Sequence, residues 1–145
     1  MIRPDVLCIF LFTFVNASLF ANDDAKTFTG DWEVAATMIE GNEVPADFNR
    51  MIQLKMDGKR YITSRMGEVV DEGTFLLMSD TKPAKIEIMG LKGENAGKKI
   101  RGIYKLEGKD KLIICYELEG KAYPETFEGK RPGMVLITYT RKKAG

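Results

Sequence analysis

Apolar and polar residues alternate with a period of two through most of the chain after Gly30, which is the pattern of β-strands that bury one face. The segment 52–56 shows the pattern clearly, because its first, third and fifth residues are apolar and the two between them are polar. The alternation predicts eight strands, at residues 32–39, 52–56, 59–65, 72–78, 84–89, 99–106, 111–118 and 134–141.

Turn signals separate most of these predicted strands. Asp57-Gly58 predicts a two-residue hairpin turn in which both residues need a positive φ, and Met66-Gly67 marks another break. The segment 41–50 reads as a connection with room for one helical turn, and the glycine-rich segment 91–98 reads as a loop. We expect no other helix after residue 21. The sequence therefore predicts an all-β fold, a single eight-stranded, mostly antiparallel, up-and-down β-barrel.

The beginning of the chain has the features of a secretory signal peptide. Arg3 precedes an apolar run at 6–15, which suits a signal peptide and is too short to span a bilayer. Small residues allow cleavage after Ala17 or after Ala21, and Ala21 is preferred because an acidic, polar run would then begin the mature chain. We therefore expect a signal peptide at 1–21, a barrel domain at 22–145, and export to the periplasm, the cell envelope or the extracellular space. The alternative is an uncleaved membrane anchor, which would also keep the chain outside the cytoplasm.

Two residues at the ends of the predicted barrel resemble a pair found in lipocalins. Gly30-Asp31-Trp32 is a Gly-x-Trp motif at the first strand, and Arg141 lies at the end of the last strand. The resemblance implies a lipocalin-like barrel in which the Trp32 ring plugs the closed end and the Arg141 guanidinium stacks across it, as a structural closure. The alternative for Trp32 is a ring that stacks on a ligand inside the cup.

A longer series of motifs resembles a family of exported, uncharacterised lipocalin-like domains that is abundant in planctomycete-type bacteria. The matching segments, in order, are Gly30-Asp31-Trp32, Gly41 with Pro45, 82–87, 102–108 with Leu112, Cys115, 124–127 and Arg141. One position departs from the family pattern, because Tyr123 stands where an arginine usually precedes a Pro-x-x-Phe element. The resemblance implies a lipocalin-like fold and export, and it implies no known activity.

The charge of the chain is nearly balanced, with 22 basic and 21 acidic residues and a net charge of +1. No long block of one sign occurs, which argues against a nucleic-acid partner. Removal of the signal peptide would leave Cys115 as the single cysteine, so the exported domain would have no internal disulfide and would depend on a buried core. We expect the domain to be a monomer.

The inventory of reactive residues argues against catalysis. The chain has no histidine, which is a common general base near neutral pH and the commonest metal ligand. Cys115 lies in an apolar strand and is expected to be a buried, inert thiol. The carboxylate pairs Asp23-Asp24 and Asp71-Glu72 read as solvent-facing charge, the first in a mobile start of the domain and the second at a strand edge. We therefore predict no enzyme, no metal and no cofactor.

The predicted barrel suggests a cup for a ligand, because an eight-stranded barrel has an interior just wide enough for packed side chains or one small molecule. The first hypothesis is therefore a binding module outside the cytoplasm for a small, mostly apolar ligand. The candidate lining residues alternate inward and include phenolic hydroxyls to orient a polar end of the ligand; they are Met56, Tyr61, Phe75, Ile86, Tyr104 and Tyr116. The alternative for each of them is ordinary core packing.

A second hypothesis is an interaction protein, such as an inhibitor or an envelope-assembly partner, without a small-molecule ligand. The surface expected to contact the partner is the long loop 119–133, which begins at Glu119, ends at Gly133 and carries Tyr123 and Phe127. The alternative for Phe127 is that its ring folds back and caps the mouth of the barrel.

Overall fold

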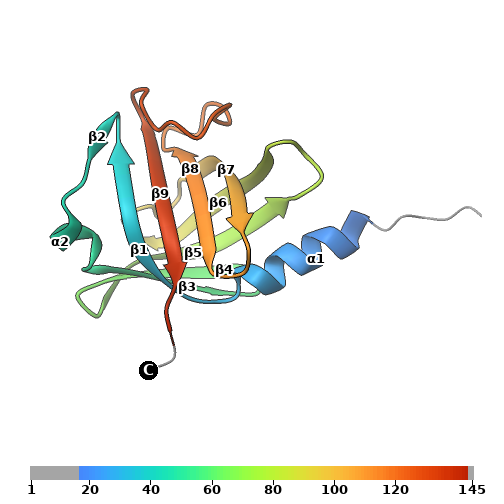
Figure 1. Cartoon of the computed structure of the whole chain (residues 1–145), viewed down its shortest axis with the longest axis horizontal. Helices are drawn as coiled ribbons and strands as arrows, with labels where there is room; N and C mark the ends of the chain where they lie inside the picture. Colours follow the sequence, from blue (N-terminus) through green and yellow to red (C-terminus); the bar gives the residue numbers. More distant parts are fainter. Residues whose placement is uncertain (1–16, 144–145) are drawn as a thin grey trace, which may run out of the picture.

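The computed structural model describes residues 17–143, with side chains from residue 23 onward (Figure 1). The described residues form α1 (Ala17–Phe28), β1 (Gly30–Ile39), β2 (Asn42–Glu43), α2 (Ala46–Asn49), β3 (Ile52–Asp57), β4 (Arg60–Arg65), β5 (Glu68–Met78), β6 (Ala84–Gly93), β7 (Lys99–Glu107), β8 (Lys111–Glu117) and β9 (Met134–Arg141). Neither helix in this part of the chain has the length and apolar character that a membrane crossing requires.

The strands form one antiparallel sheet that closes on itself. Neighbouring strands pair in the order β1-β3-β4-β5-β6-β7-β8-β9, and β9 pairs back with β1 from Trp32↔Arg141 to Ile39↔Val135. The two residues of β2 add a short extra strand at the end of β1. The predicted eight-stranded, antiparallel, lipocalin-like barrel is therefore confirmed, and its closure covers the strand edges that would otherwise be open to pairing.

The hairpin turns lie where the turn signals predicted them, with one shift. The first turn consists of Gly58 and the residue after it, because β3 continues through Asp57, which pairs with Arg60. Among these turn residues only Gly58 has a positive φ, of 60°, so the expectation of two positive values at Asp57-Gly58 is wrong. The next turn does have two positive values, 53° at Met66 and 83° at Gly67.

Strands β5 and β6 are longer than the alternation predicted. β5 begins at Glu68 and not at Glu72, and β6 continues beyond Met89 to Gly93. The added residues alternate weakly, but their backbones pair, as Asp71 does with Gly93. Pairing between the two strands therefore makes both of them longer than the local alternation of apolar and polar residues predicts. The same pairing brings Asp71 next to the loop that follows β6.

A bulge in β1 changes which of its residues face inward. The pairing of β1 with β9 slips by one residue between Val34 and Ala36, which reverses the alternation at that point. Beyond the bulge, Thr37 and Ile39 line the interior, whereas a uniform alternation from Val34 would have placed Ala36 and Met38 there.

The sequence predicted no helix before the first strand, and this prediction is wrong, because the structure forms α1 there. The helix ends at Phe28, whose side chain is fully buried and whose ring centroid lies 5.9 Å from that of Phe75 and 5.0 Å from that of Tyr104. Figure 1 shows α1 at the end of the barrel where β1 begins. The ring of Phe28 therefore fills that end of the barrel.

The predicted signal peptide overlaps the described part of the chain only at its end. Residues 1–16 lie outside the described residues, and 17–21 belong to α1. Cleavage stays a prediction, and either expected site would leave Phe28 on the mature chain.

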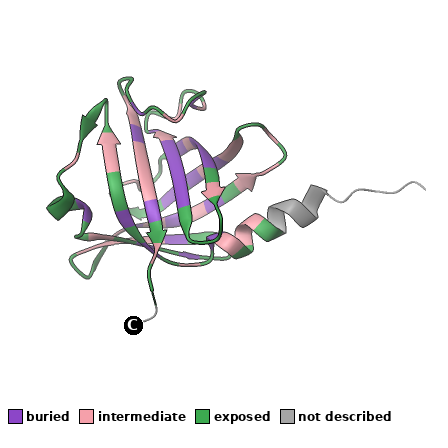
Figure 2. Ribbon diagram, in the orientation of Figure 1, coloured by how far each residue is buried: buried purple, intermediate pink, exposed green. Residues whose placement is uncertain are grey.

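The main core lies at the end of the barrel next to α1, which we call the closed end. Its buried side chains come from α1 and from strands around the barrel; they are Phe28, Trp32, Phe75, Ile86, Tyr104, Leu112 and Ile114. Figure 2 shows that β8 is buried over most of its length. This strand is covered on both sides, since the barrel interior lies on one face and the loop 119–133 lies over the other.

Candidate functional site

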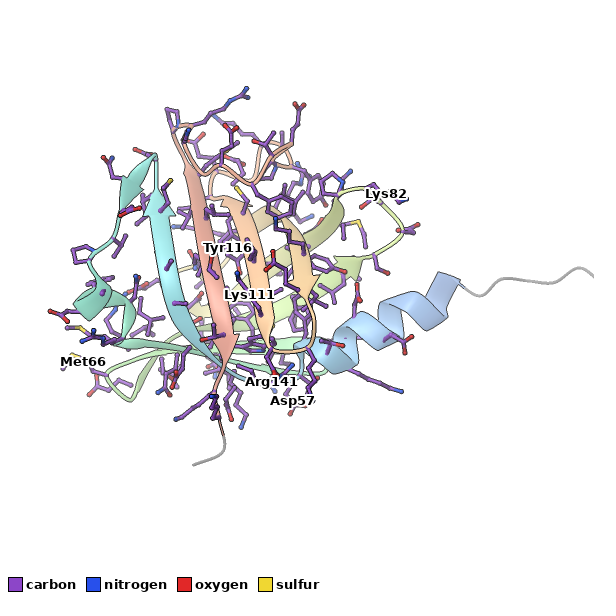
Figure 3. The ribbon with its side chains drawn as sticks, viewed as in Figure 1. Asp57, Met66, Lys82, Lys111, Tyr116 and Arg141 are labelled. Atoms are coloured by element: carbon purple, nitrogen blue, oxygen red, sulfur yellow. The ribbon has the colours of Figure 1, made fainter. Side chains whose placement is uncertain are left out.

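The half of the barrel away from α1 contains a cavity of about 250 Å³. Apolar side chains from strands around the barrel form much of its wall; they include Val34, Leu54, Met56, Ile88, Ile100 and Ile137. The strand pairing places this cavity between the closed end and the loops that follow β1, β4, β6 and β8. Figure 3 shows Met66, in the turn after β4, far from Asp57 and Arg141 at the closed end.

Half of the predicted ligand-contacting residues line this cavity. These are Met56, Tyr61 and Tyr116. The other three do not line it, and they are buried in the core of the closed end: Phe75, Ile86 and Tyr104. For Phe75 and Tyr104 the reason is Phe28, whose ring packs against theirs and occupies the space that they would otherwise offer to a ligand.

Trp32 and Arg141 meet at the closed end and lie outside the cavity. The Trp32 side chain is fully buried, and the guanidinium carbon of Arg141 lies 4.3 Å from the ring centroid. The indole Nε1 donates to the carbonyl oxygen of Phe28 at 2.8 Å. The guanidinium also donates to the carbonyl oxygens of Thr29 and Lys109, at 2.9 and 2.7 Å. The pair therefore joins β1 and β9 to the end of α1 and to the turn between β7 and β8.

A polar cluster interrupts the apolar wall of the cavity. Asp71, which is 7% exposed, accepts a hydrogen bond from the Tyr61 hydroxyl at 3.2 Å and another from the Asn95 side-chain amide at 2.7 Å. The Asn95 backbone N–H donates to the second carboxylate oxygen at 3.3 Å. All three residues line the cavity. A carboxylate has about four acceptor positions, so these bonds leave one position for a further donor.

Two more tyrosines add hydroxyl groups to the cavity lining. Tyr116 and Tyr139 both line it, and their hydroxyls interact with each other. Burial raises the pKa of Tyr139 to about 12. Burial, reinforced by Tyr139, raises the pKa of Tyr116, and burial together with the charge of Asp71 raises the pKa of Tyr61. All three phenols therefore stay protonated near neutral pH and act as hydrogen-bonding groups.

The position of Asn95 depends on two glycines in the second half of β6. A Cβ at Gly90 would overlap the backbone oxygen of Asn95, and a Cβ at Gly93 would overlap the backbone oxygen of Val70. The loop after β6 can therefore fold onto β5 only where these side chains are absent. Gly93 was visible in the sequence, but only as a loop signal, because its contact partner Val70 lies on β5 and is distant along the chain.

Three of the four carboxylates that were predicted to face solvent have partners in the structure. Asp71 belongs to the cavity lining, and only its neighbour Glu72 faces outward, 3.8 Å from the ammonium of Lys92. Asp24, in α1, accepts a hydrogen bond from the buried Tyr104 hydroxyl at 2.5 Å. Asp24 therefore helps to attach α1 to the barrel.

The mouth of the cavity is surrounded by large apolar side chains. Ile39, Phe48 and Leu118 line the cavity and are 44, 45 and 45% exposed. Met66 and Val69, at the turn between β4 and β5, are exposed at the same end of the barrel. Exposed apolar patches of this kind occur at ligand-binding grooves and interaction sites.

The loop 119–133 lies against the outer face of the barrel. The Tyr123 hydroxyl donates to the Glu87 carboxylate at 3.2 Å, and the ammonium of Lys85 lies 4.7 Å from the Tyr123 ring centroid. The ammonium of Lys105 lies 4.8 Å from the ring centroid of Phe127. Phe127 therefore packs over β7 and does not cap the mouth, and both aromatic residues of the loop are partly buried.

The same loop covers Cys115. The thiol lies on the outer side of β8, is fully buried, and accepts a hydrogen bond from the backbone of Gly129. Burial raises its pKa, although the Gly129 bond acts in the opposite direction. The expected buried thiol is confirmed, and it lies outside the cavity lining.

No protein-family model and no curated protein matches this chain. The resemblance to exported lipocalin-like domains therefore stays a prediction. Across residues 17–143, no group of three or more cysteine, aspartate or glutamate side chains is arranged to hold a metal ion.

Proposed function

We propose that this protein is an exported, lipocalin-like binding protein that holds a small, mostly apolar ligand in its barrel and catalyses no reaction. The observation that carries the proposal is the cavity of about 250 Å³, whose largely apolar wall contains a few polar groups, among them the cluster around Asp71, and whose mouth is lined by exposed apolar side chains. Small-molecule sites typically combine a concave apolar wall with a few placed polar groups. The signal peptide predicted at 1–21 supports a role outside the cytoplasm.

The volume of the cavity limits the size of the ligand. An apolar cavity of about 150 Å³ binds benzene, so this cavity has room for roughly ten non-hydrogen atoms. A longer ligand would extend through the mouth, where Ile39, Phe48 and Leu118 would cover its apolar chain. The ligand would be stabilised mainly by removal of apolar surface from water, at about 25 cal/mol per Å².

Binding without catalysis fits the chemistry of the lining. The chain has no histidine, and Cys115 lies outside the cavity. The phenols of Tyr61, Tyr116 and Tyr139 have raised pKa values, so they stay protonated near neutral pH and do not act as general bases. These groups can hold and orient a ligand by hydrogen bonds.

A cavity-filling variant tests the proposed function. Ile88→Trp adds a large side chain inside the cup, whereas the control Leu76→Trp makes the same kind of addition on the outer face of β5, where Leu76 is 58% exposed. We expect n-octanol to bind saturably to the wild-type protein and to the control in calorimetric titrations, and at least about tenfold more weakly to Ile88→Trp, a loss of about 1.4 kcal/mol.

Native mass spectrometry of the protein isolated from its own host gives a second test. We expect a small molecule to be retained on the monomer and to be released on unfolding. The proposal is wrong if the wild-type protein binds no small apolar compound saturably, or if Ile88→Trp binds n-octanol as tightly as the control does.

A further inference from the structure

We propose that the ligand of this cavity is a small organic cation, an amine whose ammonium group lies beside Asp71 and whose apolar part fills the cup. The inference rests on the proposed binding function and names the chemical class of the ligand. It is carried by the charges, hydrogen bonds and aromatic rings of the cavity lining.

The lining has an excess negative charge. Its charged residues within the described part of the chain are Arg65, Asp71 and Glu94, which gives one positive and two negative groups. Arg65 and Glu94 neutralise each other, because their side chains approach to 3.1 Å between Nη1 and Oε1 and to 3.5 Å between Nη2 and Oε2. The carboxylate of Asp71 is thus the unbalanced charge of the cavity.

Asp71 is held by neutral donors and has no positive partner among the described residues that line the cavity. Its hydrogen bonds come from the Tyr61 hydroxyl and from two N–H groups of Asn95. A carboxylate that is 7% exposed gains more from a positive partner than one in water, since the surroundings screen the attraction less. An ammonium group on the ligand would supply that partner and would occupy the fourth acceptor position of the carboxylate.

The tyrosines add acceptors and aromatic rings to the same site. Because the Tyr61 hydroxyl donates a hydrogen bond to Asp71, the Tyr61 oxygen is left with its lone pairs as acceptors. Tyr116 and Tyr139 contribute two further phenol rings to the lining. An ammonium group has three N–H donors to share among such acceptors, and it is attracted to the faces of phenol rings.

An anionic ligand fits this cavity poorly. The guanidinium of Arg65 is already paired with Glu94 through Nη1 and Nη2, so a ligand carboxylate would find only the buried Nε of Arg65 as a donor at the mouth. Deeper in the cup the same carboxylate would meet Asp71, and the repulsion between two carboxylates would be weakly screened there. A neutral alcohol would bind through the apolar wall and would lose only the charge–charge attraction.

A series of three ligands with the same alkyl chain tests the inference on the wild-type, full-length protein. We would titrate n-octylammonium, n-octanol and n-octanoate at pH 7 by isothermal titration calorimetry. We expect n-octylammonium to bind roughly 10- to 100-fold more tightly than n-octanol, which is the range for hydrogen bonds to a charged group, and n-octanoate to bind more weakly than n-octanol.

Two charge-neutralising variants locate the effect. Asp71→Asn removes the negative charge in the cup, and the control Glu72→Gln removes the same charge from the adjacent outward-facing residue. We expect Asp71→Asn to remove the preference for n-octylammonium and to leave n-octanol binding within about twofold, whereas Glu72→Gln should keep the wild-type order. Tyr116→Phe should weaken n-octylammonium binding roughly 3- to 10-fold and n-octanol binding less, because it deletes one acceptor.

The outcomes separate this inference from the function on which it rests. If n-octanol and n-octylammonium bind equally well to the wild-type protein, or if Asp71→Asn retains the full preference, the ligand class is wrong and the binding function stands. If none of the three ligands binds saturably, the proposed binding function itself is wrong. Where Asp71→Asn does not fold, as judged by circular dichroism, the wild-type series and Tyr116→Phe decide the question.

Discussion

Replacement of Arg141 tests how the barrel is closed, because this side chain contacts three separate elements. Its guanidinium lies 4.3 Å from the Trp32 ring centroid and donates to the carbonyl oxygens of Thr29 and Lys109, at 2.9 and 2.7 Å. Its Nε lies 3.3 Å from the Asp110 carboxylate. We expect Arg141→Met, which keeps an apolar stem, to lower the free energy of unfolding by about 2–4 kcal/mol.

The magnitude follows from the individual contacts. The cation–π contact is worth about 1 kcal/mol, because the Arg141 side chain is 25% exposed and thus intermediate between surface and buried cases. The charge-assisted bonds to the carbonyl oxygens of Thr27, Thr29 and Lys109 add about 1.5–3 kcal/mol together, after allowance for their partial exposure. The ion pair with Asp110 adds little, since the Asp110 side chain is 66% exposed.

A double-mutant cycle with Trp32→Leu separates these contributions. Trp32→Leu alone should cost about 3 kcal/mol, because the indole is fully buried. We expect a coupling energy between the two positions of about 1 kcal/mol, measured by urea unfolding followed by circular dichroism. Lys142→Met is the matched control, since Lys142 is the exposed neighbour of Arg141 and its substitution should change the free energy of unfolding by less than about 0.5 kcal/mol.

Two results would refute this reasoning. A coupling energy of zero would mean that the guanidinium does not stabilise the barrel through the Trp32 ring. A coupling energy as large as the whole loss in Arg141→Met would mean that the bonds to Thr27, Thr29 and Lys109 contribute nothing.

Three further predictions concern other parts of the molecule. Gly90→Ala should lower the free energy of unfolding by about 1–3 kcal/mol and weaken ligand binding, because the new Cβ overlaps the backbone oxygen of Asn95. An unchanged midpoint of unfolding in urea would contradict this prediction. Cys115 should be alkylated slowly in the native protein and rapidly in urea, as followed by mass spectrometry of its peptide, because burial raises the pKa of the thiol and blocks access; equal rates would contradict this. Burial raises the pKa of Tyr139 from 10.0 to about 12. This residue should therefore contribute stability that is complete below pH 10 and is lost as the pH rises through about 12. Phenolate absorbance that follows one ordinary transition near pH 10 in the native protein would contradict this prediction.

The sequence predicted the barrel well because burial of one strand face leaves a local mark. The last strand has the predicted bounds, Met134 to Arg141, and most other strands agree within a few residues. The hairpin signals also act over a few residues, which is why Met66-Gly67 was found and the turn at Gly58 shifted by only one position. The alternation and the turn signals are enough to predict strands and hairpins whose structure depends on neighbouring residues along the chain.

The candidate site was predicted only in part because it depends on distant contacts. The alternation identified Met56, Tyr61 and Tyr116 as inward-facing, but it could not show that Phe28 fills the closed end. Asp71 looked like surface charge, since nothing near it in the sequence indicates its bond to Asn95, which is 24 positions away. The bulge in β1 likewise follows from pairing with β9, at the other end of the chain.

An NMR titration of the labelled, full-length protein with n-octylammonium would show where a ligand binds. We predict saturable shifts of the backbone amides of Val34, Asp71 and Asn95 at the cavity, with little change at Lys59 and Asp110 in the turns of the closed end. Shifts confined to the outer face of the barrel, or no saturable shift at any residue that lines the cavity, would contradict a ligand-binding cup.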